Sequence, residues 1–191
     1  GAVAPLADNE KFTGILTMFS NPILGLLAGT ILTAVIQSSS ASVGILQALC
    51  ATGAVNFSTA LPIIMGQNIG TCVTAIISSI GTSKNAKRAA AVHLFFNISG
   101  TVIFMVVFYT LNTFVHFSFL NTAASPAGIA VIHSLFNIGA TILLFPFANL
   151  LEKMAILAIP DKGSEVEEME EEKINPDLAR LDERFLDKPG F

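Results

Sequence analysis

Charge is the scarcest property of this sequence. Only 13% of its 191 residues are Asp, Glu, Lys or Arg, about half of the 25% that is typical of soluble domains. None of these residues occurs in two long stretches, 12–83 and 89–151. Each stretch is long enough for two or three membrane spans of about 20 residues. The mean hydropathy of +0.68 agrees, so the scarcity of charge excludes an ordinary soluble domain and indicates an integral membrane protein.

Other residue types and arrangements that are scarce or absent exclude further classes of function. There are only two cysteines, Cys50 and Cys72, and their spacing is not that of a metal site, so we expect buried free thiols. Neither charge-free stretch contains a carboxylate, which argues against a proton relay through Asp or Glu. No nucleophile–base arrangement is recognisable, so we expect no enzymatic activity. The net charge of −4 reflects an acidic run over 165–172 and gives no reason to expect a nucleic-acid partner.

The most informative polar residues interrupt the first apolar stretch. Ser20-Asn21-Pro22 is typical of a helix start, and the apolar run from Pro22 to Ile36 predicts a helix of about 22 Å. Such a helix is too short to cross a bilayer core of about 30 Å. It ends at Gln37-Ser38-Ser39-Ser40, and a second short helix is expected from Ala41 to Thr52. Two short apolar helices joined by a polar break predict a re-entrant hairpin, and one bent span is the alternative.

A second polar interruption follows in the next apolar segment. Gly66-Gln67-Asn68-Ile69-Gly70-Thr71 places two glycines around an amide pair. Because glycine permits unwinding of the backbone, we expect the helix to break there and to resume from Cys72 to Ile80. Paired breaks in short apolar segments are typical of transporters whose binding site lies near the bilayer midplane.

The remaining segments predict the topology. A hydrophilic loop over 81–88 carries Lys84, Lys87 and Arg88, and the positive-inside rule places it in the cytoplasm. Two full spans are expected, the first from Ala89 to about Leu111 and the second from Pro126 to about Leu150. From this cytoplasmic loop the first full span leads outside, residues 112–125 form an outside loop, and the second full span returns the chain to the cytoplasm, so the tail is cytoplasmic as well.

This topology divides the chain into three regions. Residues 1–19 form an exposed lead-in with a short interfacial helix from Phe12 to Phe19. Residues 20–151 form the membrane domain, which contains the hairpin, the broken helix and the two full spans. Residues 152–191 form an acidic cytoplasmic linker followed by the start of a further helical segment.

A local repeat places two His–Asn pairs at helical spacing. His93 and Asn97 are four residues apart, as are His133 and Asn137, so each pair shares one helix face. The simpler interpretation is a polar stripe that holds helices together, and direct ligation of substrate is the alternative. Because ionisable side chains at membrane depth are often functional, both pairs are candidate supporting residues.

The hairpin tip carries chemistry that suits an anion together with a cation. Serine hydroxyls and the free N–H groups after Ser40 would bind an oxyanion, helped by the positive end of the helix dipole. Bare carbonyls near Ile36 and the side-chain oxygens of Gln37, Asn68 and Thr71 would bind the cation. We therefore expect a membrane transporter, and a membrane-anchored regulatory or scaffold protein is the alternative from another class.

Two motifs resemble one transporter family. Residues 25–41, GLLAGTILTAVIQSSSA, are similar to the signature of the sodium-dependent phosphate cotransporters, the bacterial relatives of type II sodium–phosphate symporters. The segment from Gly66 to Thr71 resembles the motif that follows in that family, and the two His-x-x-Phe-Asn segments fit as well. The resemblance covers about residues 12–150.

The resemblance implies a fold and a function. Family members contain two inverted repeats, each with a Gln-Ser-Ser-Ser tip, and this chain has one tip in the order of the second repeat. A first repeat, or a second copy in a dimer, would complete the site. The implied function is sodium-coupled symport of inorganic phosphate by alternating access across the inner cell membrane, with another small anion as the alternative substrate. The segment from Arg180 to Phe191 resembles the start of a PhoU-like domain.

The same resemblance implies a set of ligands and no cofactor other than the coupling sodium ion. For phosphate they are Gln37, Ser38, Ser39, Ser40 and Asn68, and for sodium they are Gln37, Ser38, Asn68 and Thr71.

Overall fold

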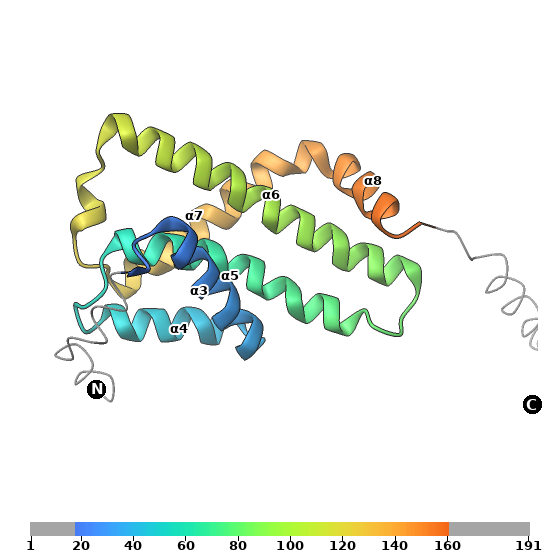
Figure 1. The fold of residues 1–191 in the computed structure, drawn as a ribbon, viewed down its shortest axis with the longest axis horizontal. Helices are drawn as coiled ribbons and strands as arrows, with labels where there is room; N and C mark the ends of the chain where they lie inside the picture. The colour runs from blue at the N-terminus through green and yellow to red at the C-terminus, as the bar shows by residue number, and fades with distance from the viewer. Residues whose placement is uncertain (1–17, 161–191) are drawn as a thin grey trace, which may run out of the picture. The chain divides into compact units, whose positions relative to one another are not determined.

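The computed structural model describes residues 18–160, and within this range the chain is almost entirely α-helical (Figure 1). Three helical segments are long and apolar enough to cross a membrane. The expected all-α membrane fold is therefore confirmed. The interfacial helix expected from Phe12 and the PhoU-like segment expected from Arg180 lie outside the described residues. The helices are α3 (Pro22–Ile36), α4 (Ser39–Cys50), α5 (Phe57–Ser78), α6 (Lys84–Val115), α7 (Pro126–Leu144) and α8 (Ala148–Ala158), with 3-10 turns η1 (Ser118–Asn121) and η2 (Phe145–Phe147).

Helices α3 and α4 form the expected hairpin. Near the start of α3, Gly25 lies against Pro62 of α5, and at the end of α4, Cys50 packs with Ala60 of α5. Both open ends of the hairpin therefore lie beside the beginning of α5. The chain reverses between α3 and α4, which excludes the single bent span. Figure 1 shows both short helices beside α5.

The helix break expected at Gly66–Thr71 is absent, because α5 runs without interruption from Phe57 to Ser78. The glycines serve close packing instead. A Cβ added at Gly66 would collide with the carbonyl of Leu26, and one at Gly29 would collide with the carbonyl of Ile63. The Thr30 hydroxyl donates to the carbonyl oxygen of Gly66 at 3.1 Å across the same contact. Small residues thus let α3 and α5 approach backbone to backbone.

The three basic residues expected in a loop over 81–88 all lie in a helix. Helix α6 begins at Lys84, and the Ser83 hydroxyl accepts a hydrogen bond from the Ala86 N–H at 3.4 Å. A basic residue can occupy the first turns of this helix because its side chain extends to the membrane interface. The helix continues to Val115, beyond the expected end at Leu111, and His116 then adopts the left-handed conformation with φ 52°.

The last span is bent near Pro146. Helix α7 ends at Leu144, the turn η2 contains the proline, and α8 continues to Ala158. Proline lacks an N–H and clashes with the preceding turn, so a straight α-helix cannot pass through it. Helix α8 therefore runs past Glu152, where the tail is expected to begin. Figure 1 shows the α5–α6 connection and the end of α8 on one side, and η1 on the other.

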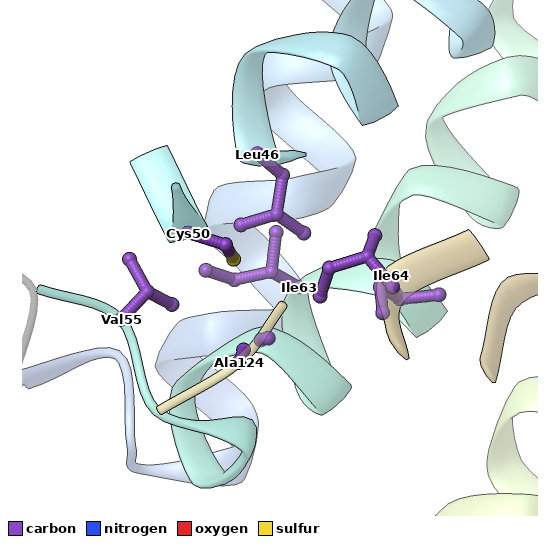
Figure 2. Packing of buried hydrophobic residues seen from close by; sticks show 8 residues of the cluster. Leu46, Cys50, Val55, Ile63, Ile64 and Ala124 are labelled. Carbon is purple, nitrogen blue, oxygen red and sulfur yellow. The ribbon is translucent and has the colours of Figure 1, made fainter. Parts of the chain in front are cut away.

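One apolar cluster fixes the open end of the hairpin. Figure 2 shows Leu46 and Cys50 of α4 packed with Ile63 and Ile64 of α5. Val55 and Ala124, from two connecting segments, close the cluster, and the Ala124 N–H donates to the Val55 carbonyl at 2.8 Å. Cys50 and Cys72 are both buried free thiols, as expected. The cluster anchors one end of the hairpin and leaves its tip at the other.

Candidate functional site

The hairpin tip is a two-residue break between α3 and α4. Gln37 follows α3 in the left-handed conformation, with φ 57°, and its N–H donates to the Thr33 carbonyl at 2.7 Å. Ser38 is extended and caps α4, because its Oγ accepts a hydrogen bond from the Ala41 N–H at 3.3 Å. A left-handed residue commonly ends a helix, and serine is a preferred N-cap. The sequence therefore stops one helix and starts the next within two residues.

The serines lie where the new helix begins. Helix α4 starts at Ser39, two residues before the expected Ala41, so Ser39 and Ser40 occupy its first turn. The hydroxyl oxygens of Ser38 and Ser40 are 3.2 Å apart, and both Gln37 and Ser40 are exposed. The first N–H groups of a helix lack partners within it. Four of the expected ligands are thus brought together at one accessible turn.

A buried polar cluster, which the sequence analysis missed, lies one helical turn behind the tip. The Thr33 hydroxyl donates to Ser42 Oγ at 2.8 Å, and Gln67 Nε2 donates to the same oxygen at 2.9 Å. All three side chains are 0% exposed. They join α3, α4 and α5. The sequence signal for this cluster was helical spacing. Thr33 lies four residues before Gln37, and Ser42 lies four residues after Ser38, so each shares a helix face with a tip residue.

Asn68 and Thr71 are not brought to the tip by any hydrogen bond in the described part of the chain. Asn68 Nδ2 donates to the Ile64 carbonyl at 3.0 Å, and the Thr71 hydroxyl donates to the Gln67 carbonyl at 2.9 Å. Both bonds stay within α5. Their oxygen-ligand roles remain predictions, whereas the Gln67 side chain of α5 forms a hydrogen bond to the hairpin.

The two His–Asn pairs make the same local bond. Asn97 Nδ2 donates to the His93 carbonyl at 2.9 Å, and Asn137 Nδ2 donates to the His133 carbonyl at 2.8 Å. The Cys72 thiol of α5 also lies 3.6 Å from the His93 carbonyl oxygen. These contacts favour the packing interpretation for His93 and Asn97. A supporting role of either pair in ligand binding stays a prediction.

The chain is similar to one protein family and to several known proteins. The family model described as Na+/Pi-cotransporter matches residues 3–133. The uncharacterized protein YqeW of Bacillus subtilis (strain 168) is 34% identical over 138 residues, which are 72% of this chain and 44% of YqeW. No solved structure matches the chain.

Mammalian relatives match a shorter part. Sodium-dependent phosphate transport protein 2B of Homo sapiens is 37% identical over 97 residues, 48% of this chain and 14% of that protein. Sodium-dependent phosphate transport protein 2A of Rattus norvegicus is 42% identical over 86 residues, 42% of this chain and 14% of that protein. The chain spans less than half of each of these relatives. The matches confirm the resemblance: the chain belongs to the Na+/Pi-cotransporter family, a family of transporters rather than of enzymes.

Proposed function

We propose that this chain forms half of a sodium-coupled phosphate symporter, with the tip from Gln37 to Ser40 as its binding site. One observation carries the proposal. The C-terminal end of α3 and the N-terminal end of α4 meet at a two-residue break, in which Gln37 is exposed and Ser38 is half-buried. One turn therefore offers bare carbonyl oxygens and bare N–H groups side by side.

The start of α4 would bind phosphate. The hydroxyls of Ser38 and Ser40 are close enough, at 3.2 Å, to contact one tetrahedral oxyanion. The N–H groups of Ser39 and Ser40 lie in the first turn of α4, where the helix dipole supplies about half a positive charge. Helix N-termini bind phosphate for these two reasons together.

The end of α3 would bind sodium. The carbonyl groups of its last turn and the side-chain oxygen of Gln37 are suitable hard ligands, and Asn68 and Thr71 are proposed to complete the shell. No Asp or Glu occurs between residues 18 and 151, so the helical hairpin holds no fixed anion. An ion pair of sodium and phosphate reduces the electrostatic penalty of placing either ion in a medium of low dielectric.

Transport would be alternating access around this tip. The short hairpin supplies one side of a site that a first repeat, or a second copy of the chain, would complete. We place the protein in the inner cell membrane, with the basic start of α6 in the cytoplasm by the positive-inside rule. Arg88 of α6 and Glu152 of α8 line one pocket, so the end of the last span lies on the same side.

Uptake into proteoliposomes tests the proposal. Purified chain would be reconstituted at high density, alone and with a first repeat of the family, and given labelled phosphate under an inward sodium or potassium gradient. We expect uptake only with sodium, and loss of uptake in Ser38→Ala/Ser39→Ala. The matched control is Ser78→Ala/Ser79→Ala, which changes another adjacent serine pair at the end of α5. Equal uptake with both cations, or full uptake by the tip variant, would contradict the proposal.

A further inference from the structure

All polar side chains of α7 lie on one face of this span. We call them the polar face of α7, and they are His133, Ser134, Asn137 and Thr141. A helix turns by about 100° per residue, so these positions fall within a sector of roughly 100°. On one side of the sector lie the buried residues Ile129, Phe136 and Ala140, and on the other lie the exposed residues Val131, Leu135, Ile138 and Ile142. The polar face therefore separates the packed side of α7 from an apolar side that suits lipid.

The helices of residues 18–160 do not cover the polar face. Ser134 and Thr141 are exposed, and His133 and Asn137 are half-buried. The Ser134 hydroxyl and the His133 ring make no hydrogen bond within these residues. Asn137 Nδ2 donates to the His133 carbonyl at 2.8 Å, which leaves Oδ1 as an acceptor. A bilayer core has no water to satisfy such groups, and a histidine within a span almost always faces the protein interior or a water-filled cavity, so the polar face is not a lipid-facing surface.

The polar face begins at about the depth of the hairpin tip. Gln47 Nε2 of α4 donates to the carbonyl oxygen of Pro126, the first residue of α7, at 3.0 Å. Both helices also pack against the apolar cluster of Figure 2, so they run side by side, in opposite directions. Ser40 lies seven residues before Gln47, and His133 lies seven residues after Pro126. Each is therefore about 10 Å from the shared bond along its own helix, which places His133 level with the tip.

From this depth the polar face continues toward the side that carries the basic start of α6. Thr141 lies eight residues after His133, about 12 Å further along α7. The chain then passes through η2 into α8, whose end lies on the same side as the α5–α6 connection (Figure 1). That side is cytoplasmic in the proposed topology. The polar face thus extends from the depth of the tip into the cytoplasmic half of the bilayer.

We propose that the polar face of α7 lines a water-filled path that joins the hairpin tip to the cytoplasm. Water would satisfy its hydroxyl, amide and imidazole groups, which have no other partner. Hydroxyl and amide groups offer both donors and acceptors, so the path suits phosphate and sodium alike, and both ions would leave the tip along it. This transport role rests on the proposed function, whereas the presence of water along α7 does not.

Cysteine accessibility tests the path, because both native cysteines are buried. Ser134→Cys and Thr141→Cys place thiols on the polar face, and the matched controls Ile138→Cys and Ile142→Cys place them on the exposed apolar side of the same helix. Inside-out membrane vesicles that contain the full chain would be treated with a charged, membrane-impermeant methanethiosulfonate. Because only the thiolate reacts and lipid does not support its formation, the polar-face thiols should react roughly tenfold or more faster than the controls. All four thiols should react after denaturation in SDS.

The outcomes separate the path from the proposed function. Equal rates on the two sides of α7 would overturn the path, and so would two polar-face thiols that react only after denaturation, because another helix would then cover the face. Modification of Ser134→Cys should also abolish sodium-dependent phosphate uptake, whereas Ile138→Cys treated in the same way should keep it. Uptake that survives the modification would overturn the transport role. Fast reaction in a chain that takes up no phosphate, even with a first repeat, would leave the water path standing and refute the proposed function instead.

Discussion

Gln67 of α5 donates a hydrogen bond from Nε2 to Ser42 Oγ of α4 at 2.9 Å, in a place where neither side chain is exposed. The Thr33 hydroxyl of α3 donates to the same oxygen. Ser42 therefore joins both arms of the hairpin to a full span, one turn behind the tip. Because buried hydrogen bonds fix orientation where water cannot replace them, the tip is held by α5 rather than by its own turn alone.

Removing the Ser42 hydroxyl, which accepts both hydrogen bonds, should destabilise the protein more than removing the Gln67 amide. Ser42→Ala leaves the donors of Thr33 and Gln67 buried without their partner, at a cost of about 1–3 kcal/mol. Gln67→Met deletes the amide and its Oε1, which has no partner among the described residues, so we expect a smaller loss. The double variant should be more stable than the sum of the two losses predicts, as measured in a double-mutant cycle of thermal unfolding. Strict additivity would show that the bond does not couple α4 to α5.

Close packing of α3 on α5 makes Gly66 intolerant of a side chain. Gly66→Ala would drive Cβ into the Leu26 carbonyl, and overpacking of this kind typically costs about 1–3 kcal/mol. Gly44→Ala is the matched control, because a Cβ at Gly44 meets only open space. It should be neutral or stabilising. A thiol-reactive dye that reports exposure of the buried Cys50 and Cys72 on heating would measure both. Equal unfolding temperatures would show that the α3–α5 contact is looser than described.

Gln37 has a backbone role and a proposed ligand role that one substitution can separate. Its φ of 57° lies in the left-handed region, which glycine adopts without steric penalty. Gln37→Gly should therefore keep the thermal stability of the chain while it weakens sodium-dependent phosphate binding. Gln37→Asn keeps an amide oxygen and tolerates the same conformation, so binding should be partly restored. Unchanged binding in the glycine variant would remove Gln37 from the ligand set.

Single cysteines at the start of α6 and in η1, which follows its other end, test the orientation. Asn85 and Asn121 are both exposed, whereas the native thiols Cys50 and Cys72 are buried. A membrane-impermeant maleimide applied to intact cells should label Asn121→Cys at once. It should label Asn85→Cys only after permeabilisation, because the basic end of α6 is proposed to be cytoplasmic. The unsubstituted chain serves as the background. The reverse pattern would invert the topology.

Local signals gave the hairpin correctly. Asn21, Pro22 and the polar break at Gln37 bound α3 at the residues observed, Pro22–Ile36. These signals act within one or two turns, because capping and a left-handed helix end depend on adjacent residues. For the same reason, the short length of α3 was enough to predict a segment that enters the bilayer without crossing it.

Sequence signals whose meaning depends on a residue far away in the chain led to wrong or missing predictions. Glycines at 66 and 70 fit either an unwound backbone or a close helix contact, and only the position of α3 decides between the two. Gln67 and Ser42 are 25 residues apart, so no local pattern joins them. The bend between α7 and α8, by contrast, could have been predicted from the sequence, because Pro146 is a local signal for it.

The central claim is that the tip from Gln37 to Ser40 binds phosphate together with sodium. The most direct measurement is equilibrium binding of labelled phosphate to the purified chain, in sodium chloride and in potassium chloride, beside Ser38→Ala/Ser39→Ala and the control Ser78→Ala/Ser79→Ala. We expect binding that requires sodium, is lost in the tip variant and survives in the control. Sodium-dependent binding that persists in the tip variant would contradict it.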